Sequence, residues 1–438
     1  MSLGDYTRSR RPGPAGRGCL SDSVKMSAHA AGGFITRSRA GTRPPCAGHE
    51  TVLDVEVDVH VCMVTPHMPP EQAANALLPS VLARELAHAG HRTTFLTHPA
   101  QGSPRSMLGR TVYVRRRGRG LLARSHLGAV ATAARIGVAA ARAFRGADLV
   151  HLHSNGFIVD VAGWMAARLA RPAVVTLYGT DVWHFDPGRH GRFASVVRGA
   201  AQRVFYSRAL RHRAVELGLA TPDAPVIYAP VDEMFRAPAN SEREAIRRAL
   251  GVSGPMLLTV KRLHPVAGYE DLLKAFAILA PRVPDARLFI AGSGELRKDL
   301  ERQAEAAGIA PRIRFLGLVE NQDLPKYYAA ADLFVLPSRL ESWGTVMLEA
   351  LACGTPVVAT ATAGAREAHE YFDADLRLTP LEAPGDLASA VEHALGASRR
   401  ASERTLERIA STFRPAGCAR AYRAVYETAL ADAARRNH

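Results

Sequence analysis

Cysteine is scarce in this chain of 438 residues, which has only five, at positions 19, 46, 62, 353 and 418. None of them has the Cys-x-x-Cys spacing typical of zinc ligands, and they are too scattered for a disulfide scaffold. Isolated thiols of this kind are typical of proteins in a reducing cytosol. We therefore predict a cytoplasmic protein without a structural zinc site.

Long hydrophobic runs are also missing. The best candidate, Leu127 to Phe144, is interrupted by Arg135 and Arg142, and membrane spans rarely carry two central arginines. The arginines near the start of the chain are not followed by the apolar segment of a secretory signal. We expect neither a transmembrane helix nor a cleaved leader.

Acidic residues are absent from Leu86 to Ala147, a stretch that carries eleven arginines in a chain of formal net charge +15. A surface of one sign attracts phosphates, anionic lipid head groups or nucleic acid. Aromatic residues are not interleaved with these arginines as base stacking requires, so no nucleic-acid partner is expected.

Within this stretch, the segment from Arg115 to Arg124 also contains Leu121 and Leu122. Arginines beside leucines are typical of a segment that rests on an anionic membrane surface. The alternative is a solvated arginine loop that binds nothing in particular. We predict a peripheral contact with the inner face of a membrane through this region.

The order of hydrophobic patterns predicts two α/β domains. Strand, loop, helix and strand follow one another from Val55, and the same order restarts near residue 255. A strand is expected even for the short segment Pro225–Pro230. Residues 1–50 are rich in Gly, Pro, Ser and Arg and are predicted to be disordered, or to follow a start codon assigned too far upstream. The predicted boundaries are 51–235 for the first domain, 236–415 for the second, and 416–438 for a last helix that reaches back to the first.

The most specific motif lies between Ala331 and Thr360, where a buried strand, a loop and a helix follow one another. Backbone amides at the start of that helix, at Gly344, Thr345 and Val346, form an anion site suited to a diphosphate. Glu341 before the helix and Glu349 inside it flank this site, where they could accept hydrogen bonds from sugar hydroxyls.

This stretch resembles the donor-site signature of glycosyltransferase family 4, the retaining enzymes of the GT-B fold, in which seven residues separate two glutamates. The resemblance implies two Rossmann-like doubly wound domains that face each other across a cleft. It implies that Glu341 faces the donor sugar as a catalytic residue, that Glu349 binds the ribose, and that Gly344 to Val346 hold the diphosphate. The alternative is an ordinary strand–loop–helix with two solvated glutamates.

The segment Val260–Phe276 is similar to the first donor-domain turn of the same family, where an arginine and a lysine neutralise the diphosphate. Arg262 matches the arginine and is assigned to catalysis and to binding. The lysine position falls on Ala267, which departs from the family pattern. Lys261 or His264 could supply the missing charge.

Three further segments carry weaker resemblances. Gly292 and Gly294 follow a strand and would allow the backbone to pass near the base and ribose. His153 matches a family histidine near the transferred sugar and is assigned to catalysis; a buried structural histidine is the alternative. Asp181 and His184 would lie toward the acceptor, and the loop Pro69–Ala76 lacks the glycines usual in the family.

Together with the resemblance, these features predict transfer of a sugar from a UDP- or GDP-sugar to a hydroxyl of an acceptor saccharide, glycolipid or small molecule, with retention, in glycan, polysaccharide or glycolipid biosynthesis. The resemblance implies that no metal or other cofactor is required, because amides and basic side chains stabilise the leaving diphosphate in that family. Asp373 and Asp375 spell a DxD sequence but are interpreted as loop caps. A sugar-phosphate synthase on the same fold and a catalytically degenerate binding protein remain the alternatives.

Overall fold

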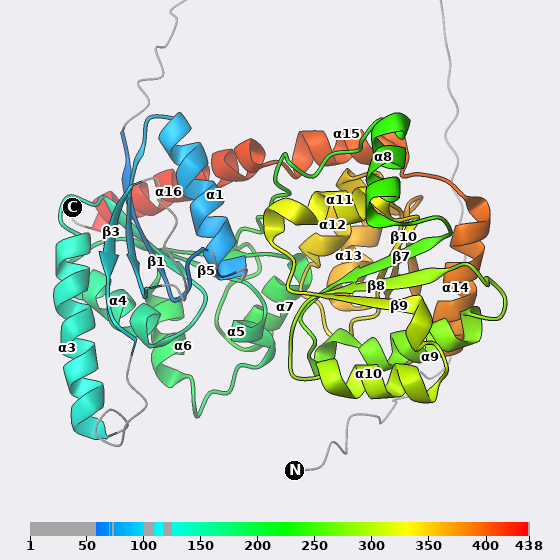
Figure 1. The fold of residues 1–438 in the computed structure, drawn as a ribbon. Helices are drawn as coiled ribbons and strands as arrows, with labels where there is room; N and C mark the ends of the chain where they lie inside the picture. The colour runs from blue at the N-terminus through cyan, green and yellow to red at the C-terminus, as the bar shows by residue number, and fades with distance from the viewer. Residues whose placement is uncertain (1–57, 70, 72–73, 100–108, 117–124, 437–438) are drawn as a thin grey trace, which may run out of the picture. The chain divides into compact units, whose positions relative to one another are not determined.

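The computed structural model describes residues 58–69, 71, 74–99, 109–116 and 125–436 (Figure 1). The predicted disordered extension, residues 1–50, lies outside the described residues. None of the helices in the described part of the chain combines the length and the apolar character that crossing a bilayer requires.

The first sheet has six parallel strands in the order β3-β2-β1-β4-β5-β6. They are β1 His60–Thr65, β2 Arg92–Thr97, β3 Arg110–Tyr113, β4 Leu149–His153, β5 Ala173–Leu177 and β6 Gln202–Phe205. The helices that accompany them are α1 Ala74–His88, α3 His126–Ala143, α4 Phe157–Arg168, α5 Thr180–Trp183, α6 Gly191–Gly199 and α7 Arg208–Glu216. Every residue of β4 is buried, as expected for a parallel strand covered on both faces.

The second sheet repeats this topology in the order β12-β11-β10-β7-β8-β9. Its strands are β7 Met256–Val260, β8 Arg287–Ala291, β9 Ile313–Gly317, β10 Leu333–Leu336, β11 Val357–Thr360 and β12 Leu376–Thr379. Its α-helices are α8 Asn240–Leu250, α9 Tyr269–Leu279, α10 Arg297–Ala306, α11 Leu324–Ala330, α12 Thr345–Ala352, α13 Ala363–Phe372, α14 Pro384–Ala397 and α15 Glu403–Thr412. Three 3₁₀ turns complete it, η1 Pro265–Ala267, η2 Ala310–Arg312 and η3 Asn321–Asp323.

The predicted α/β class is therefore confirmed, while one predicted strand is wrong. Residues 225–230 form only an isolated bridge between Phe205 and Val226. Proline at positions 225 and 230 cannot donate a backbone hydrogen bond, so the ladder does not extend.

The two sheets lie on either side of the predicted boundary at residue 235, which itself stays a prediction. The described residues up to Phe235 form the N-terminal half, and Arg236 to Phe413 form the C-terminal half. The last helix, α16 Pro415–Arg436, packs against α1, β5 and β6 of the N-terminal half (Figure 1).

A buried carboxylate joins the two halves. Glu367 on α13 accepts hydrogen bonds from the backbone amides of Arg208, at 2.8 Å, and Ala209, at 3.1 Å, in the first turn of α7. The Tyr228 hydroxyl donates to the same carboxylate at 2.7 Å. A side chain of one half thus satisfies helix-terminal amides of the other, which otherwise have no partner within their helix.

Candidate functional site

The second sheet reverses its strand order between β7 and β10, which lie side by side although β8 and β9 follow β7 in sequence. Ligands of open α/β sheets bind outside the carboxyl ends of the strands at such a point. Lys261 and Arg262 follow β7, and the loop with Glu341 follows β10. The topology therefore brings two of the predicted motifs to one edge of the sheet.

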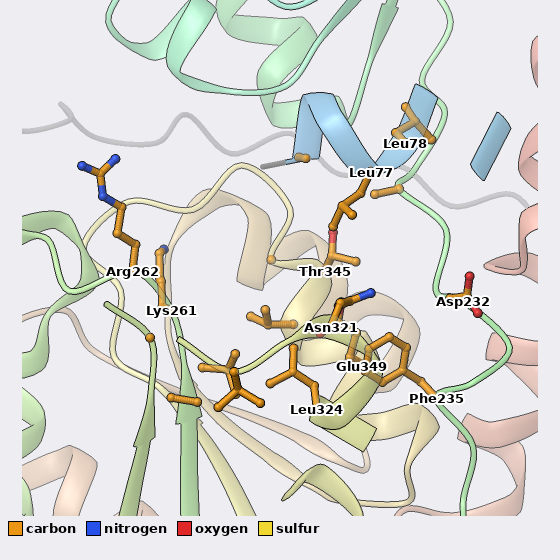
Figure 2. A pocket seen from close by; sticks show the side chains of 18 of the residues that line it. Leu77, Leu78, Asp232, Phe235, Lys261, Arg262, Asn321, Leu324, Thr345 and Glu349 are labelled. Atoms are coloured by element: carbon orange, nitrogen blue, oxygen red, sulfur yellow. The ribbon is translucent and has the colours of Figure 1, made fainter. Parts of the chain in front are cut away.

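A cavity of 780 Å³ opens at this edge (Figure 2). Residues from both halves line it. The C-terminal half contributes all ten donor-binding and catalytic candidates except His153, namely Lys261, Arg262, Gly292, Gly294, Glu341, Gly344, Thr345, Val346 and Glu349. The N-terminal half contributes Leu77, Leu78 and Val81 from α1. Figure 2 shows Leu77 reaching from α1 toward Thr345.

The start of α12 has the geometry that the motif predicts. Gly344 caps the helix with φ of 79°, in the left-handed region that favours glycine. A Cβ there would lie 2.7 Å from the Met347 Cε and 3.0 Å from the Glu341 Cγ. Thr345 and Val346 begin the helix, so their amide groups belong to the first turn and have no acceptor within the helix.

Lys261 forms an ion pair with Glu341 that the sequence did not reveal. Its ammonium lies 2.6 Å from the Glu341 Oε2 and 2.8 Å from the Ser338 Oγ, to which it also donates. The two charged side chains are only 21% and 17% exposed. The cavity therefore holds a shielded cation beside the carboxylate assigned to the donor sugar.

The structure distinguishes Lys261 from His264, the two candidates to replace the lysine that is missing at Ala267. His264 is absent from the cavity lining, and its Nδ1 accepts a hydrogen bond from the Val266 amide at the start of η1. Ala267 is 1% exposed and belongs to the apolar core around α9. Of the two candidates, Lys261 is thus the one that lines the cavity, beside Arg262.

Glu349 is partly buried and lines the cavity. Burial raises its pKa to about 7, the hydrogen bond from the Tyr328 hydroxyl at 2.8 Å opposes this shift, and the negative charge of Asp232 adds to it. A carboxyl group with this pKa changes its charge near neutral pH. Neither Tyr328 nor Asp232 was among the residues predicted for the site.

Gly292 and Gly294 are required by the packing of the chain itself. Gly292 has φ of 143°, and a Cβ there would overlap the Lys261 carbonyl oxygen. A Cβ at Gly294 would overlap the Leu263 carbonyl oxygen. Both glycines therefore let the turn after β8 pass against the turn after β7, in addition to lining the cavity.

His153 lies elsewhere. It is fully buried, it does not line the cavity, and its Nδ1 forms a hydrogen bond with the Tyr178 hydroxyl at 2.7 Å. Burial lowers its pKa to about 3, so the ring is neutral at physiological pH. Its ring lies 3.9 Å from that of His151, as expected for alternate residues of one strand. Its catalytic assignment stays a prediction.

The DxD sequence has a structural role at Asp375. Its Oδ2 accepts hydrogen bonds from the Ser402 amide at 2.9 Å, from the Ser402 hydroxyl at 2.6 Å and from the Thr405 hydroxyl at 2.7 Å. These bonds hold the start of α15 against the end of α13. Across the described ranges, no group of three or more His, Cys, Asp and Glu residues could hold a metal ion.

Comparison with known protein families identifies the family of this chain. Residues 242–402 match the family described as Glycosyl transferases group 1, and residues 81–235 match Glycosyltransferase Family 4. The chain belongs to glycosyltransferase family 4. The family resemblance carried by the Ala331–Thr360 motif is thereby confirmed.

Two curated relatives illustrate the range of this glycosyltransferase family. Mannosylfructose-phosphate synthase of Agrobacterium fabrum is 37% identical over 148 residues, which are 32% of this chain and 33% of that protein. A GDP-mannose-dependent phosphatidylinositol monomannoside mannosyltransferase of Mycolicibacterium smegmatis is 34% identical over 210 residues, 45% of this chain and 54% of the relative. The match thus spans between a third and about half of their lengths.

The solved structures include Anabaena HepE in complex with UDP and glucose, with a TM-score of 0.69 and 19% identity. That similarity covers 84% of this chain and 100% of HepE. The two-domain GT-B fold expected for this family 4 glycosyltransferase is therefore confirmed.

Proposed function

We propose that this protein transfers a sugar from a UDP- or GDP-sugar to an acceptor hydroxyl, with retention of anomeric configuration. The supporting observation is one cavity at the β7–β10 switch point that combines the Lys261–Glu341 pair, the first amides of α12 and the partly buried Glu349. The donor binds the C-terminal half, and the acceptor enters from the N-terminal half.

In the proposed mechanism, the diphosphate lies at the start of α12, and its charge is offset by Lys261, Arg262 and the amides of Gly344 to Val346. Glu349 accepts hydrogen bonds from the ribose, and Glu341 faces the sugar. The bond between the anomeric carbon and the phosphate oxygen breaks as the acceptor oxygen bonds to the same face. The acceptor proton passes to the departing phosphate oxygen. These steps use side chains and amides of this chain and need no resident metal or organic cofactor.

The acceptor is proposed by class alone. A lipid-linked saccharide or a growing polysaccharide fits a role in glycan, polysaccharide or glycolipid biosynthesis. The second candidate function is a sugar-phosphate synthase, favoured by the similarity to mannosylfructose-phosphate synthase. Turnover that requires a phosphorylated sugar acceptor, and fails with its dephosphorylated form, would favour the synthase.

We also propose that the protein works in the cytoplasm, in peripheral contact with an anionic membrane. Residues 117–124, which include most of the predicted contact segment, lie outside the described residues. The adjoining helices support the proposal: Leu127 and Val130 on α3 are 81% and 66% exposed, and Trp164 on α4 is 57% exposed. Binding to anionic vesicles is the measurement that checks this contact.

The apolar surface has a basic border. Arg135 and Arg142 on α3 are exposed, and the Arg168 guanidinium lies 5.2 Å from the centre of the Trp164 ring. A groove of 1220 Å³ between α3, α4 and α6 continues this surface. Aliphatic and indole side chains bordered by arginines match the interface of an anionic bilayer.

Thermal stabilisation by nucleotides tests the proposed donor site. UDP, GDP and ADP are added separately to the wild type, to Glu349→Ala and to the exposed control Glu407→Ala. Because a ligand that binds only the folded state raises its stability, we expect one nucleotide to raise the melting temperature of the wild type and of the control. At a hundredfold excess over Kd the gain is about 2.7 kcal/mol.

Glu349→Ala should melt cooperatively without nucleotide and should show no shift with it. If no nucleotide stabilises the wild type, the transferase proposal fails and a catalytically degenerate binding protein is favoured. If Glu349→Ala shifts as much as the control, the nucleotide lies elsewhere.

A further inference from the structure

The loop between β10 and α12 is held by a residue of the N-terminal half. Ser342 follows Glu341 in this loop, and the Trp183 indole N–H donates a hydrogen bond to the Ser342 Oγ at 2.9 Å. Trp183 is the last residue of α5, 159 residues earlier in the chain. This contact connects the acceptor side of the molecule directly to the loop that carries Glu341.

The turn before α5 is shaped around the same hydroxyl. Gly179 caps α5 with φ of 157°, and a Cβ there would overlap the Ser342 Oγ. The buried Asp181 carboxylate accepts hydrogen bonds from the Gly179 amide, at 2.8 Å, and from the Tyr178 amide, at 3.1 Å. These bonds hold the turn in one conformation, so the Ser342 hydroxyl packs against a well-defined turn.

The opposite side of the loop contacts Gly364 and Phe413 of its own half and Tyr228 of the N-terminal half. The Gly364 amide donates to the Glu341 carbonyl oxygen at 3.0 Å, and a Cβ at Gly364 would lie 2.6 Å from the Ser342 carbonyl carbon. The Trp343 side chain is buried, with its ring 4.2 Å from that of Tyr228 and 5.8 Å from that of Phe413. The position of the loop thus depends on contacts from both halves at once.

A shift in the position of Ser342 would also move two groups of the proposed donor site. Glu341, one residue before it, pairs with Lys261 in the cavity, and Gly344, two residues after it, begins α12. Trp183 itself does not line the cavity, so it has no route to a bound donor except through the loop.

We infer that Trp183 is a positioning residue. Its hydrogen bond to Ser342 sets the Glu341 carboxylate and the first amides of α12 in their reactive positions when α5 is seated against the loop. The inference rests on the proposed function, because it assigns the contact to the same donor site. It also means that sugar transfer from the donor requires α5, on the acceptor side, to be packed against this loop.

The test compares Trp183→Phe, Ser342→Ala and the double variant with wild type. Phenylalanine keeps an aromatic ring but has no N–H, and alanine removes only the hydroxyl. Ser389→Ala, at an exposed serine on α14, is the matched control for Ser342→Ala. Release of UDP from UDP-glucose, or of GDP from GDP-mannose, measures turnover with water as acceptor, and calorimetry gives the Kd of the free nucleotide.

Each single variant should lower kcat by about tenfold, which is the upper range expected for one neutral hydrogen bond. The double variant should lose no more than the singles, because all three lack the same bond. Nucleotide Kd should change by a smaller factor than kcat, since free nucleotide contacts the α12 amides but not the sugar-facing carboxylate. Ser389→Ala should match wild type.

Unchanged kcat in the single variants, or losses that multiply in the double variant, would overturn the inference. So would variants whose lost activity is explained by a smaller folded fraction in melting curves. A wild type that binds no nucleotide would instead overturn the proposed function, which separates the two failures.

Discussion

At the scale of single residues, the charge of Glu349 is set by its surroundings. Burial raises its pKa from an ordinary 4.5 to about 7. Between these two values the unfolded chain releases this proton while the folded chain retains it. The contribution of Glu349 to stability is therefore greatest below pH 4.5, and it declines as the pH rises toward 7.

Glu349→Gln should remove this pH dependence. Between pH 5 and pH 8, the free energy of unfolding of the wild type should fall by about 2 kcal/mol more than that of Glu349→Gln. Urea unfolding at both pH values measures the difference, with the exposed Glu407→Gln as control. Parallel pH profiles for wild type and Glu349→Gln would contradict the raised pKa.

The sequence located many of these residues but not their partners. The family motif placed Glu341, Glu349 and Gly344 together, and the structure brings all three to one cavity. The Lys261–Glu341 pair spans 80 residues, and the Tyr328–Glu349 bond joins two helices. Local spacing carries no information about such distant contacts, because they depend on which strands become neighbours in the sheet.

At the scale of elements, α16 is attached to the first sheet by polar groups. The His151 Nδ1 forms a hydrogen bond with the Tyr426 hydroxyl, and its Nε2 forms one with the Thr176 hydroxyl, each at 2.8 Å. The Tyr422 hydroxyl lies 3.0 Å from the same Thr176 oxygen. Burial, with a smaller effect from His153, lowers the His151 pKa well below its ordinary value. The histidine is thus a neutral link between helix and sheet.

Tyr426→Phe should leave a buried nitrogen of His151 without its partner. Unsatisfied buried polar groups cost about 1–3 kcal/mol, so the free energy of unfolding should fall by that amount. Chemical denaturation measures it, and Tyr113→Phe, whose side chain is 45% exposed, serves as control. Equal stability of the two variants would show that the Tyr426 hydroxyl contributes nothing to the attachment of α16.

Elements were predictable wherever apolar residues continued through a strand. β7 begins where the pattern is predicted to restart, near residue 255, and β10 is the buried strand predicted in the Ala331–Thr360 motif, because each is a short apolar run before a turn. Residues 225–230 have the same apolar character but form no ladder beyond one bridge. The side chains alone suggested a strand there, whereas the prolines limited the backbone hydrogen bonds.

At the scale of the whole molecule, the proposed membrane contact combines the excess of positive charge with the exposed apolar side chains of α3. Leu127→Ser combined with Val130→Ser should weaken binding to vesicles that contain phosphatidylglycerol by about tenfold, because two exposed apolar side chains are lost. Leu381→Ser, an exposed leucine of the C-terminal half, is the control. Co-sedimentation measures the bound fraction.

Raising the salt concentration should weaken the same binding, because charge attraction is screened within about 10 Å at 0.1 M salt. Vesicles of phosphatidylcholine alone should bind less protein than those with phosphatidylglycerol. Equal binding of wild type and the double variant would exclude this surface of α3 as the contact.

The return of α16 to the first sheet has a consequence for synthesis on the ribosome. Tyr422 and Tyr426, which cover His151 and Thr176, are among the last residues described. The N-terminal half therefore remains incomplete while the entire C-terminal half is translated, although β1 to β6 emerge first. During that interval the unsatisfied polar groups of β4 and β5 are open to water or to a chaperone. The sheet that is translated first is thus completed only after the last helix has emerged.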